Sequence, residues 1–389
     1  MYLGHVKMIK KYFFCAFLLF FQNFLLFGQL KVNFLISKIP SVNDVDIHLF
    51  LAGDFNGWNP GDKAFELTPD SASGYHVTET FKPGKYQFKI TRGSWLSVEC
   101  NAAGAPVDNR EIKLSRDTTI RLVIAGWQDN FKAAEKKHTA SANVHILSDT
   151  FRMPQLGRTR RIWIYLPANY AASGKKYPVI YLQDGQNLFD DLTSSYGEWG
   201  IDEILDKLPA KDQCILIGID HGGENRITEY DPYDTKYGKG RGDDYVEFLV
   251  KTLKPYIDQH YRTRPDARHT TIVGSSMGGL ISMYAILKYP HVFGNAGIFS
   301  PAFWLSQAIY SYAASRKLPK YTNIYFVCGD AESDDMVTDV HKMVSLLRGK
   351  GLSPLNTPEV IAKGARHNEK QWNSDFPGFY SWVIKSLSH

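Results

Sequence analysis

The sequence predicts an α/β fold, with a mostly parallel central sheet covered by helices on both faces, preceded by a small all-β domain. Residues 143–389 alternate short apolar runs with helical patterns, which indicates parallel strands joined by helices. Residues 29–127 carry short alternating stretches between turn residues, which is typical of an antiparallel sandwich. A chain of 389 residues is long enough for both domains.

The segment 1–28 has the pattern of a secretory signal peptide. Basic residues ending at Lys11 precede an apolar run over residues 12–27, and Gly28 follows the run. A membrane anchor is the alternative, but the run is short for one. Removing residues 1–28 takes away three lysines and no acidic residue, so the formal charge falls from +5 to +2. We therefore expect a secreted or periplasmic protein without stable membrane insertion after cleavage.

The composition of the remaining chain argues against several classes of function. The chain is nearly neutral and has no basic stripe with interleaved aromatic residues, so we expect no nucleic-acid partner. Three cysteines remain, Cys100, Cys214 and Cys328. Their number is odd and their spacing wide, and Cys214 and Cys328 lie in apolar strand-like runs, which predicts buried free thiols rather than a disulfide or metal framework.

The predicted sandwich, residues 29–127, ends in a linker. Within it, residues 45–51 and 85–90 alternate apolar and polar side chains, as half-buried strands do. Residues 128–142 are polar and small, which indicates a linker with a domain boundary near residue 140.

The second domain, residues 143–389, alternates strands and helices. Apolar runs predict strands at 161–166, 179–182, 215–219 and 322–328. Residues 244–261 predict a helix packed on the sheet, because their apolar side chains recur at helical spacing. These side chains are Val246, Leu249, Val250, Leu253 and Ile257.

Residues 274–278 read Gly-Ser-Ser-Met-Gly and carry the strongest functional signal. A strand-like run over 269–273 precedes them, and a helical pattern over 280–287 follows. This context predicts the nucleophile elbow of α/β-hydrolases, in which a strained turn lifts a serine hydroxyl clear of the sheet. We expect Ser276 to be a catalytic nucleophile and the amide of Met277 to donate to an oxyanion.

A serine nucleophile needs a base, and the base needs an orienting carboxylate. In α/β-hydrolases the acid and then the histidine follow the serine along the chain. Among the histidines after Ser276, His367 lies in a loop behind the last apolar strand, 358–362, where the base is expected. The acid is expected after the strand that ends at Cys328. The candidates are Asp330, Glu332, Asp334 and Asp335, and the same run would also serve as a solvated loop that caps the next helix.

The second oxyanion donor is expected in the loop at 183–189, at the carboxyl end of a strand.

This loop is one of several motifs by which residues 145–387 resemble one branch of the α/β-hydrolases. That branch holds carbohydrate esterase family one, enterochelin-type siderophore esterases and mycolyltransferases. The motifs are Asp-Gly-Gln-Asn-Leu-Phe at 184–189, Gly-Glu-Trp-Gly at 197–200, Gly-Ile-Asp-His-Gly at 218–222, the elbow, Ser-Pro-Ala-Phe-Trp at 300–304 and His-Asn-Glu at 367–369.

This resemblance implies roles for individual residues. Glu332, three residues after the glycine that ends its strand, would be the acid, with Asp330 as the alternative. The amide of Gln186 would be the second oxyanion donor. The side chains that would line the substrate cleft are Trp199, His221 and Trp304.

The N-terminal domain carries a second resemblance. Residues 51–60 read Leu-Ala-Gly-Asp-Phe-Asn-Gly-Trp-Asn-Pro. They resemble family 48 carbohydrate-binding modules and the glycogen-binding domain of AMP-activated kinase, which are immunoglobulin-like early-set sandwiches. The resemblance implies that Trp58 and Trp95 stack on sugar rings while Lys89 and Asn109 hydrogen-bond sugar hydroxyls. Alternatively, such a domain binds no glycan and only shapes the active site.

These observations lead to three hypotheses of function. The first is a secreted serine esterase that removes acetyl or feruloyl groups from polysaccharide or oligosaccharide through an acyl-enzyme, with no metal or organic cofactor. Its partner would be an ester-bearing glycan or a small-molecule ester. The second is a siderophore esterase, in which cations on one loop receive a triscatecholate. These cations are Arg226, Lys236, Lys239 and Arg241. The third is a glycan-binding protein with a vestigial hydrolase domain.

Overall fold

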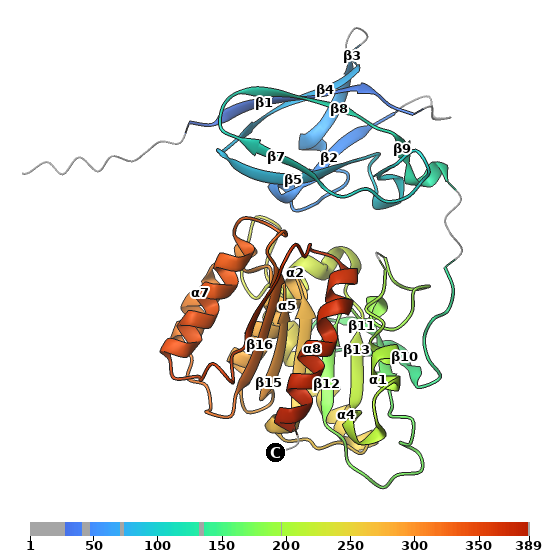
Figure 1. Cartoon of the computed structure of the whole chain (residues 1–389), viewed down its shortest axis with the longest axis vertical. Coiled ribbons are helices and arrows are strands. Elements are labelled where there is room, and N and C mark those ends of the chain that lie inside the picture. The colour runs from blue at the N-terminus through green and yellow to red at the C-terminus, as the bar shows by residue number, and fades with distance from the viewer. Residues whose placement is uncertain (1–27, 41–46, 71–73, 132–135, 196, 388–389) are drawn as a thin grey trace, which may run out of the picture. The chain divides into compact units, whose positions relative to one another are not determined.

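A computed structural model of the chain describes residues 28–40, 47–70, 74–131, 136–195 and 197–387. The chain divides into two compact units, Met1–Lys132 and Ala133–His389, and each is considered by itself (Figure 1). The predicted signal peptide, apart from Gly28, lies outside the described residues. Among the described residues, no helix is both long enough and apolar enough to cross a membrane.

The first unit is built from short strands. Its main sheet has the order β7-β5-β2-β3-β4-β1-β8, and its pairs are antiparallel except β1 with β8. The sheet folds over on itself. The ring centroids of Phe34 in β1 and Phe88 in β5 lie 5.4 Å apart, although three strands separate β1 from β5 in the sheet. The elements are β1 (Leu30–Lys38), β2 (Leu49–Gly53), η1 (Asp54–Asn56), η2 (Lys63–Phe65), β3 (Glu66–Asp70), β4 (Gly74–Phe81), β5 (Gly84–Thr91), η3 (Trp95–Ser97), β6 (Glu99–Cys100), β7 (Arg110–Leu114), β8 (Thr118–Val123), β9 (Gly126–Trp127) and η4 (Gln128–Asn130).

The all-β content of this unit agrees with the strand pattern of residues 29–127, while its immunoglobulin-like class stays a prediction. The polar segment at 128–142 crosses the boundary between the two units, which lies after Lys132. Within the second unit, the Ser141 amide donates to Asp202 at 2.7 Å, and Nδ1 of His138 lies 2.8 Å from Asp190. The polar composition of this segment predicted a linker. Hydrogen bonds to buried carboxylates nevertheless fix its second half to the second unit's own residues.

The second unit has one eight-stranded sheet in the order β10-β11-β13-β12-β14-β15-β16-β17. The pairs β10–β11 and β11–β13 are antiparallel, and the five remaining pairs are parallel. The strands are β10 (Val144–Met153), β11 (Arg158–Tyr165), β12 (Val179–Gln183), β13 (Ile215–Ile219), β14 (Thr270–Ser275), β15 (Asn295–Phe299), β16 (Asn323–Gly329) and β17 (Glu359–Ala362).

Helices connect the parallel strands. The predicted helix at 244–261 is present as α3 (Gly242–Phe248), a π turn at Leu249–Leu253 and α4 (Lys254–His260). The other helices are α1 (Ile201–Asp206), α2 (Arg226–Tyr230), α5 (Met277–Lys288), α6 (Ala308–Ser315), α7 (Met336–Gly349) and α8 (Glu369–Leu387). The short 3₁₀ turns are η5 (Gly185–Asn187), η6 (Ala210–Asp212), η7 (Gly223–Asn225), η9 (Ala267–His269) and η10 (Phe303–Leu305).

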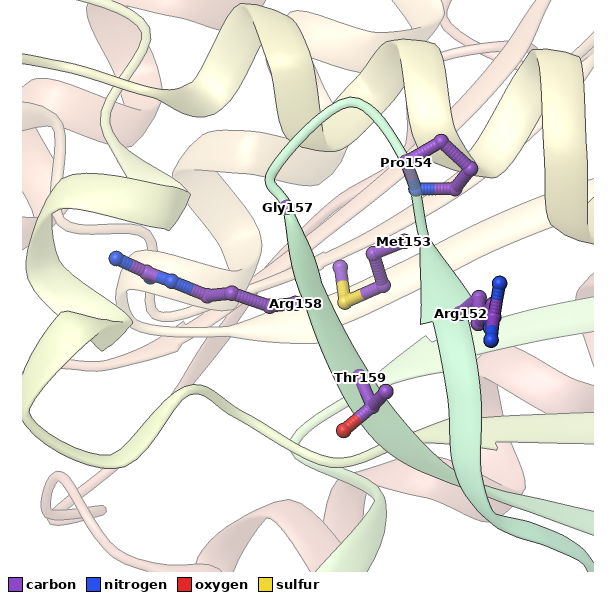
Figure 2. A pocket seen from close by; sticks show the side chains of 6 residues that line it. All are labelled: Arg152, Met153, Pro154, Gly157, Arg158 and Thr159. Carbon is purple, nitrogen blue, oxygen red and sulfur yellow. The ribbon is translucent and has the colours of Figure 1, made fainter.

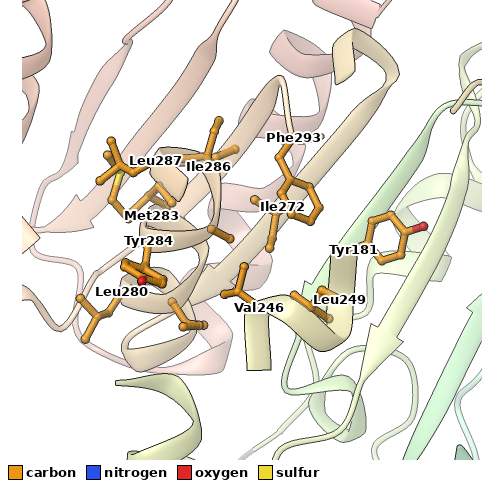
Figure 3. Packing of buried hydrophobic residues seen from close by; sticks show 14 of the residues in the cluster. Tyr181, Val246, Leu249, Ile272, Leu280, Met283, Tyr284, Ile286, Leu287 and Phe293 are labelled. Carbon is orange, nitrogen blue, oxygen red and sulfur yellow. The ribbon is translucent and has the colours of Figure 1, made fainter. Parts of the chain in front are cut away.

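Both faces of this sheet are covered by apolar side chains. Successive residues of a strand point to opposite faces. Tyr181 of β12 accordingly joins a core with Leu249 and Leu280 (Figure 3), whereas its neighbour Leu182 joins a second core with Phe376 of α8. This two-sided burial explains why the strands read as continuous apolar runs. Among the described residues, Cys214 and Cys328 are free and buried, as predicted, and Cys100 is also free and buried.

Candidate active site

Ser276 lies in the turn between β14 and α5. Its backbone has φ 56° and ψ −120°, a conformation that residues other than glycine rarely adopt. A Cβ at Gly274 would lie 2.4 Å from the carbonyl of Gly278, so the close approach of strand and helix requires glycine. The Ser276 amide donates to the Phe299 carbonyl at 3.0 Å, which ties the turn to β15. Strand, strained serine and helix together form the geometry of a nucleophile elbow.

The two predicted oxyanion donors lie at the same edge of the sheet as Ser276. β12 and β14 are neighbouring parallel strands, and Gln186 follows β12 while Met277 follows β14. Met277 begins α5, and the first amides of a helix have no acceptor within the helix. Gln186 is held on two sides, because its carbonyl accepts from the Thr193 hydroxyl at 2.8 Å and its side-chain oxygen accepts from the His221 amide at 3.2 Å.

His367 and Glu332 come together although they lie in different loops. Nδ1 of His367 lies 2.7 Å from Oε2 of Glu332. Glu332 is 4% exposed, whereas the side chain of His367 is 35% exposed. A buried carboxylate on Nδ1 fixes the orientation of the imidazole and leaves Nε2 available as a base. Among the described residues Ser276 and His367 share no hydrogen bond, and such contacts often form only with substrate bound.

Asp330, the alternative acid, has another position. Its Oδ1 accepts from the Gly364 amide at 2.6 Å, and its own amide donates to the Ala362 carbonyl. Asp330 therefore holds the start of the loop that carries His367, while Glu332 meets the imidazole itself.

The three residues expected to line a substrate cleft occupy three different environments. Trp199 is 3% exposed and packs in the core against Phe299 and Trp372, with ring centroids 5.1 and 5.7 Å away. His221 is half-buried, and its Nδ1 accepts from the Gly223 amide at 2.8 Å. Burial lowers the pKa of His221. Trp304 lies in η10 and is 44% exposed, so of the three tryptophan and histidine side chains it offers the most surface to a ligand.

The sequence did not predict a partly buried ion pair between Arg226 and Asp184, which lies in the loop of the second oxyanion donor. Nε of Arg226 lies 2.7 Å from Oδ1 of Asp184, and Nη2 lies 2.9 Å from Oδ2. Burial opposes the charge of Arg226, but the Asp184 carboxylate outweighs this effect and raises the pKa of Arg226. Asp184 has φ 56° and directly precedes η5, so the pair fixes the loop of Gln186 to α2. Arg226, expected among four cations of a siderophore site, is thus bound by a carboxylate.

Glu369 is a second residue that sequence reasoning quoted only as part of a motif. It is the first residue of α8 and is 8% exposed. Burial raises its pKa to about 7, the charges of His367 and Arg226 lower it, and that of Asp184 raises it. In the sequence, Glu369 stood out only because it lies two residues after His367. That position did not predict that the Glu369 side chain is buried.

A separate hollow of about 500 Å³ lies on the β10–β11 hairpin (Figure 2). Its lining residues are Arg152, Met153, Pro154, Gly157, Arg158 and Thr159. None of the predicted site residues lines it. Arg158 forms an ion pair with Glu229, which is fully buried and also lies 2.7 Å from Arg160. Within the described ranges, no group of three or more His, Cys, Asp or Glu side chains is arranged to hold a metal ion.

In the first unit, two of the four residues predicted to bind glycan are neighbours. The rings of Trp58 and Trp95 lie 6.3 Å apart, and Trp58 has φ 60°. Such strain in a bulky residue is a reason to suspect a function. Lys89 donates to the Val107 carbonyl, and burial lowers its pKa. Asn109 donates to the Gln87 side chain at 3.1 Å.

The family model described as "Putative esterase" matches residues 153–378, more than half of the chain. The chain belongs to this esterase family. It is of the enterochelin esterase-like type and is a carboxylic ester hydrolase with an α/β-hydrolase-like fold. The esterase is similar to the uncharacterized protein YbbA of Bacillus subtilis, at 28% identity over 243 residues, which cover 58% of this chain and 92% of that protein.

Relatives of this esterase carry two kinds of named activity. An endo-1,4-beta-xylanase/feruloyl esterase of Xylanibacter ruminicola is 28% identical over 233 residues, 57% of this chain and 29% of that protein. Ferri-bacillibactin esterase BesA of Bacillus subtilis is 23% identical over 227 residues, 50% of this chain and 75% of that protein. A solved ferulic acid esterase aligns with a TM-score of 0.50 at 19% identity, over 63% of this chain and 99% of that chain.

Proposed function

We propose that this esterase is an exported serine enzyme that hydrolyses acetyl or feruloyl esters of polysaccharide or oligosaccharide. The Ser276 hydroxyl attacks the ester carbonyl while His367 Nε2 takes its proton. The amides of Met277 and Gln186 stabilise the oxyanion. His367 returns the proton to the leaving sugar hydroxyl, and water then cleaves the acyl-enzyme by the same route. No metal or organic cofactor takes part.

The observation that carries this proposal is the contact of 2.7 Å between His367 Nδ1 and the buried Glu332. It supports an imidazole that is held in one orientation, at the same edge of the sheet as the strained Ser276. Four non-glycine residues in the described chain have positive φ, and three of them, Asp184, Ser276 and Ser300, directly follow β12, β14 and β15. Such strain persists where the surrounding structure enforces it, as at active sites.

A glycan-linked ester is supported by two further observations. One relative is named a xylanase/feruloyl esterase, although this chain covers only 29% of it. The half-buried rings of Trp58 and Trp95 in the first unit lie 6.3 Å apart, and indole faces are suited to stacking on sugar rings. Membership in an esterase family weakens the hypothesis of a binding protein with a vestigial hydrolase.

A siderophore esterase is the second candidate, because BesA matches over 75% of its own length. Two of the four cations expected to receive a triscatecholate already form ion pairs with carboxylates. Arg226 is bound to Asp184, and Arg241 is paired with Asp244. The charge available to an anionic ligand on this loop is therefore smaller than the four cations suggest.

The test is a hydrolysis panel with the wild type and Ser276→Ala: an aryl acetate, methyl ferulate, acetylated xylan and a ferric catecholate siderophore. We expect serine-dependent release from the feruloyl or xylan substrate. Serine-dependent cleavage of the siderophore alone would replace the glycan proposal with the second candidate. Full activity of Ser276→Ala would overturn the serine mechanism itself.

A further inference from the structure

Ser300 directly follows β15, and its role is not explained by its motif. It is 1% exposed, and its φ is 42°, in the left-handed region. Its amide donates to the Val327 carbonyl at 2.7 Å, which joins the ends of β15 and β16. A serine in this conformation has a strained backbone, which persists only where the surrounding structure enforces it.

The hydroxyl of Ser300 has a defined direction. Nε1 of Trp372 lies 2.9 Å from Oγ of Ser300, and Oγ lies 2.7 Å from Oε1 of Glu332. An indole nitrogen only donates, so Oγ accepts from Trp372. The single proton of the hydroxyl is then directed to the Glu332 carboxylate. The bonds therefore run from Trp372 through Ser300 to Glu332.

The two oxygens of Glu332 have separate partners. Oε1 accepts from Ser300 and from the Gly329 amide at 2.6 Å, while Oε2 lies 2.7 Å from Nδ1 of His367. The ring of Trp372 also meets the imidazole edge to face, with centroids 5.0 Å apart. Trp372 thus contacts the acid–base pair twice, through its N–H group and through its ring.

We propose that Ser300 is a positioning residue of this esterase. Its hydroxyl, directed by Trp372, holds Oε1 of Glu332 so that Oε2 stays on the imidazole of His367. The inference rests on the proposed mechanism through Ser276, His367 and Glu332. Ser300 acts through the Glu332 carboxylate, to which its hydroxyl donates.

The test is Ser300→Ala with an aryl acetate as substrate, which makes the result independent of the natural ester. The main-chain bond of Ser300 to Val327 remains in this variant. We expect kcat to fall roughly tenfold with KM within about twofold, because a hydrogen bond to a charged group is lost while substrate contacts stay. In a Glu332→Ala background, which removes the acceptor, the same substitution should change kcat by less than about twofold.

A matched control is Ser306→Ala. Ser306 is also buried and donates to a buried carboxylate, Asp231 Oδ1, at 2.8 Å. It should lower the melting temperature about as much as Ser300→Ala without the loss in kcat. Trp372→Phe keeps an aromatic ring but removes the N–H donor together with part of the indole that contacts His367, and it should lower kcat by about threefold. This variant tests the same chain of bonds if Ser300→Ala does not fold.

Unchanged kcat in both Ser300→Ala and Trp372→Phe would overturn the inference. So would an equal loss of kcat with and without Glu332, because Ser300 would then act on the fold rather than through the carboxylate. Failure of the proposed mechanism would be visible separately. A fully active Ser276→Ala or Glu332→Ala single variant would remove the mechanism before Ser300 is considered.

Discussion

Nδ1 of His367 and Oε2 of Glu332 lie 2.7 Å apart, in loops that follow the neighbouring parallel strands β17 and β16. Parallel strands end at the same edge of the sheet, and this brings together two residues 35 positions apart in the sequence. The imidazole is partly exposed to solvent, while its carboxylate partner is buried. The carboxylate that orients the imidazole is therefore shielded from water.

Glu332→Gln should lower kcat on an aryl acetate roughly 100-fold or more, because the amide no longer stabilises an imidazolium. Asp330→Asn is the matched control. Asp330 accepts from Gly364 and does not contact His367, so its variant should lose less than about tenfold. Steady-state kinetics of the two variants separate the candidate acids. A larger loss for Asp330→Asn would reverse the assignment.

Glu369→Gln should change how stability depends on pH. Burial raises the pKa of Glu369 from 4.5 to about 7, so the folded state holds a proton that the unfolded state releases. The resulting stabilisation is complete below about pH 4.5 and is lost as the pH rises through 7. The unfolding free energy of the wild type relative to the variant should then fall, by at most about 3 kcal/mol, between about pH 4 and pH 8. Urea unfolding across this range measures it.

The control for this pH effect is Lys370→Gln, on the exposed neighbour of Glu369. Its difference from the wild type should stay constant from about pH 4 to pH 8. A constant difference for Glu369→Gln as well would show that its carboxyl does not titrate with a raised pKa.

Asp184→Asn should destabilise the protein by about 2 kcal/mol, because it removes a buried carboxylate from the half-buried guanidinium of Arg226. Asp244→Asn breaks the ion pair with Arg241, in which the carboxylate is 44% exposed, and should cost less than about 1 kcal/mol. Denaturant unfolding compares the two variants directly. Similar costs would mean that the Asp184 pair is not shielded from solvent.

Gly274→Ala should prevent folding or cost several kcal/mol, because the added Cβ would lie 2.4 Å from the main chain of Gly278. Gly349→Ala, at the end of α7, has nothing within 4 Å of its added Cβ. This control should leave the melting temperature equal or slightly higher, since alanine favours a helix over glycine. A folded, stable Gly274→Ala protein would show that the elbow can widen.

Trp58→Ala should weaken binding of the protein to an insoluble glycan about tenfold, because an indole face that stacks on a sugar ring is lost. Leu96→Ala is the control, since Leu96 is 81% exposed and adjoins Trp95. Pull-down with acetylated xylan and with starch measures the effect. Equal binding by the wild type and Trp58→Ala would favour a domain that binds no glycan.

Local patterns predicted much of the fold and one part of the site. The elbow was readable because its strand, turn and helix are consecutive, and the steric conflict at Gly274 involves a residue four positions away. The helix at 244–261 was readable from its periodic apolar side chains. Its π turn at Leu249–Leu253 was not, because helical spacing does not distinguish one widened turn.

The sequence by itself determined the two-part organisation, the alternating strands and helices, the nucleophile elbow and the short set of candidate acids and bases. Only the tertiary structure decided which acid meets His367, that Trp199 is a core residue, and that Asp184 and Ser300 have charged partners 42 and 32 residues away. The physical reason is that strand and turn preferences act between near neighbours. The order of strands in the sheet decides which loops lie together. Burial then excludes water, so each charged group must find its partner within the protein.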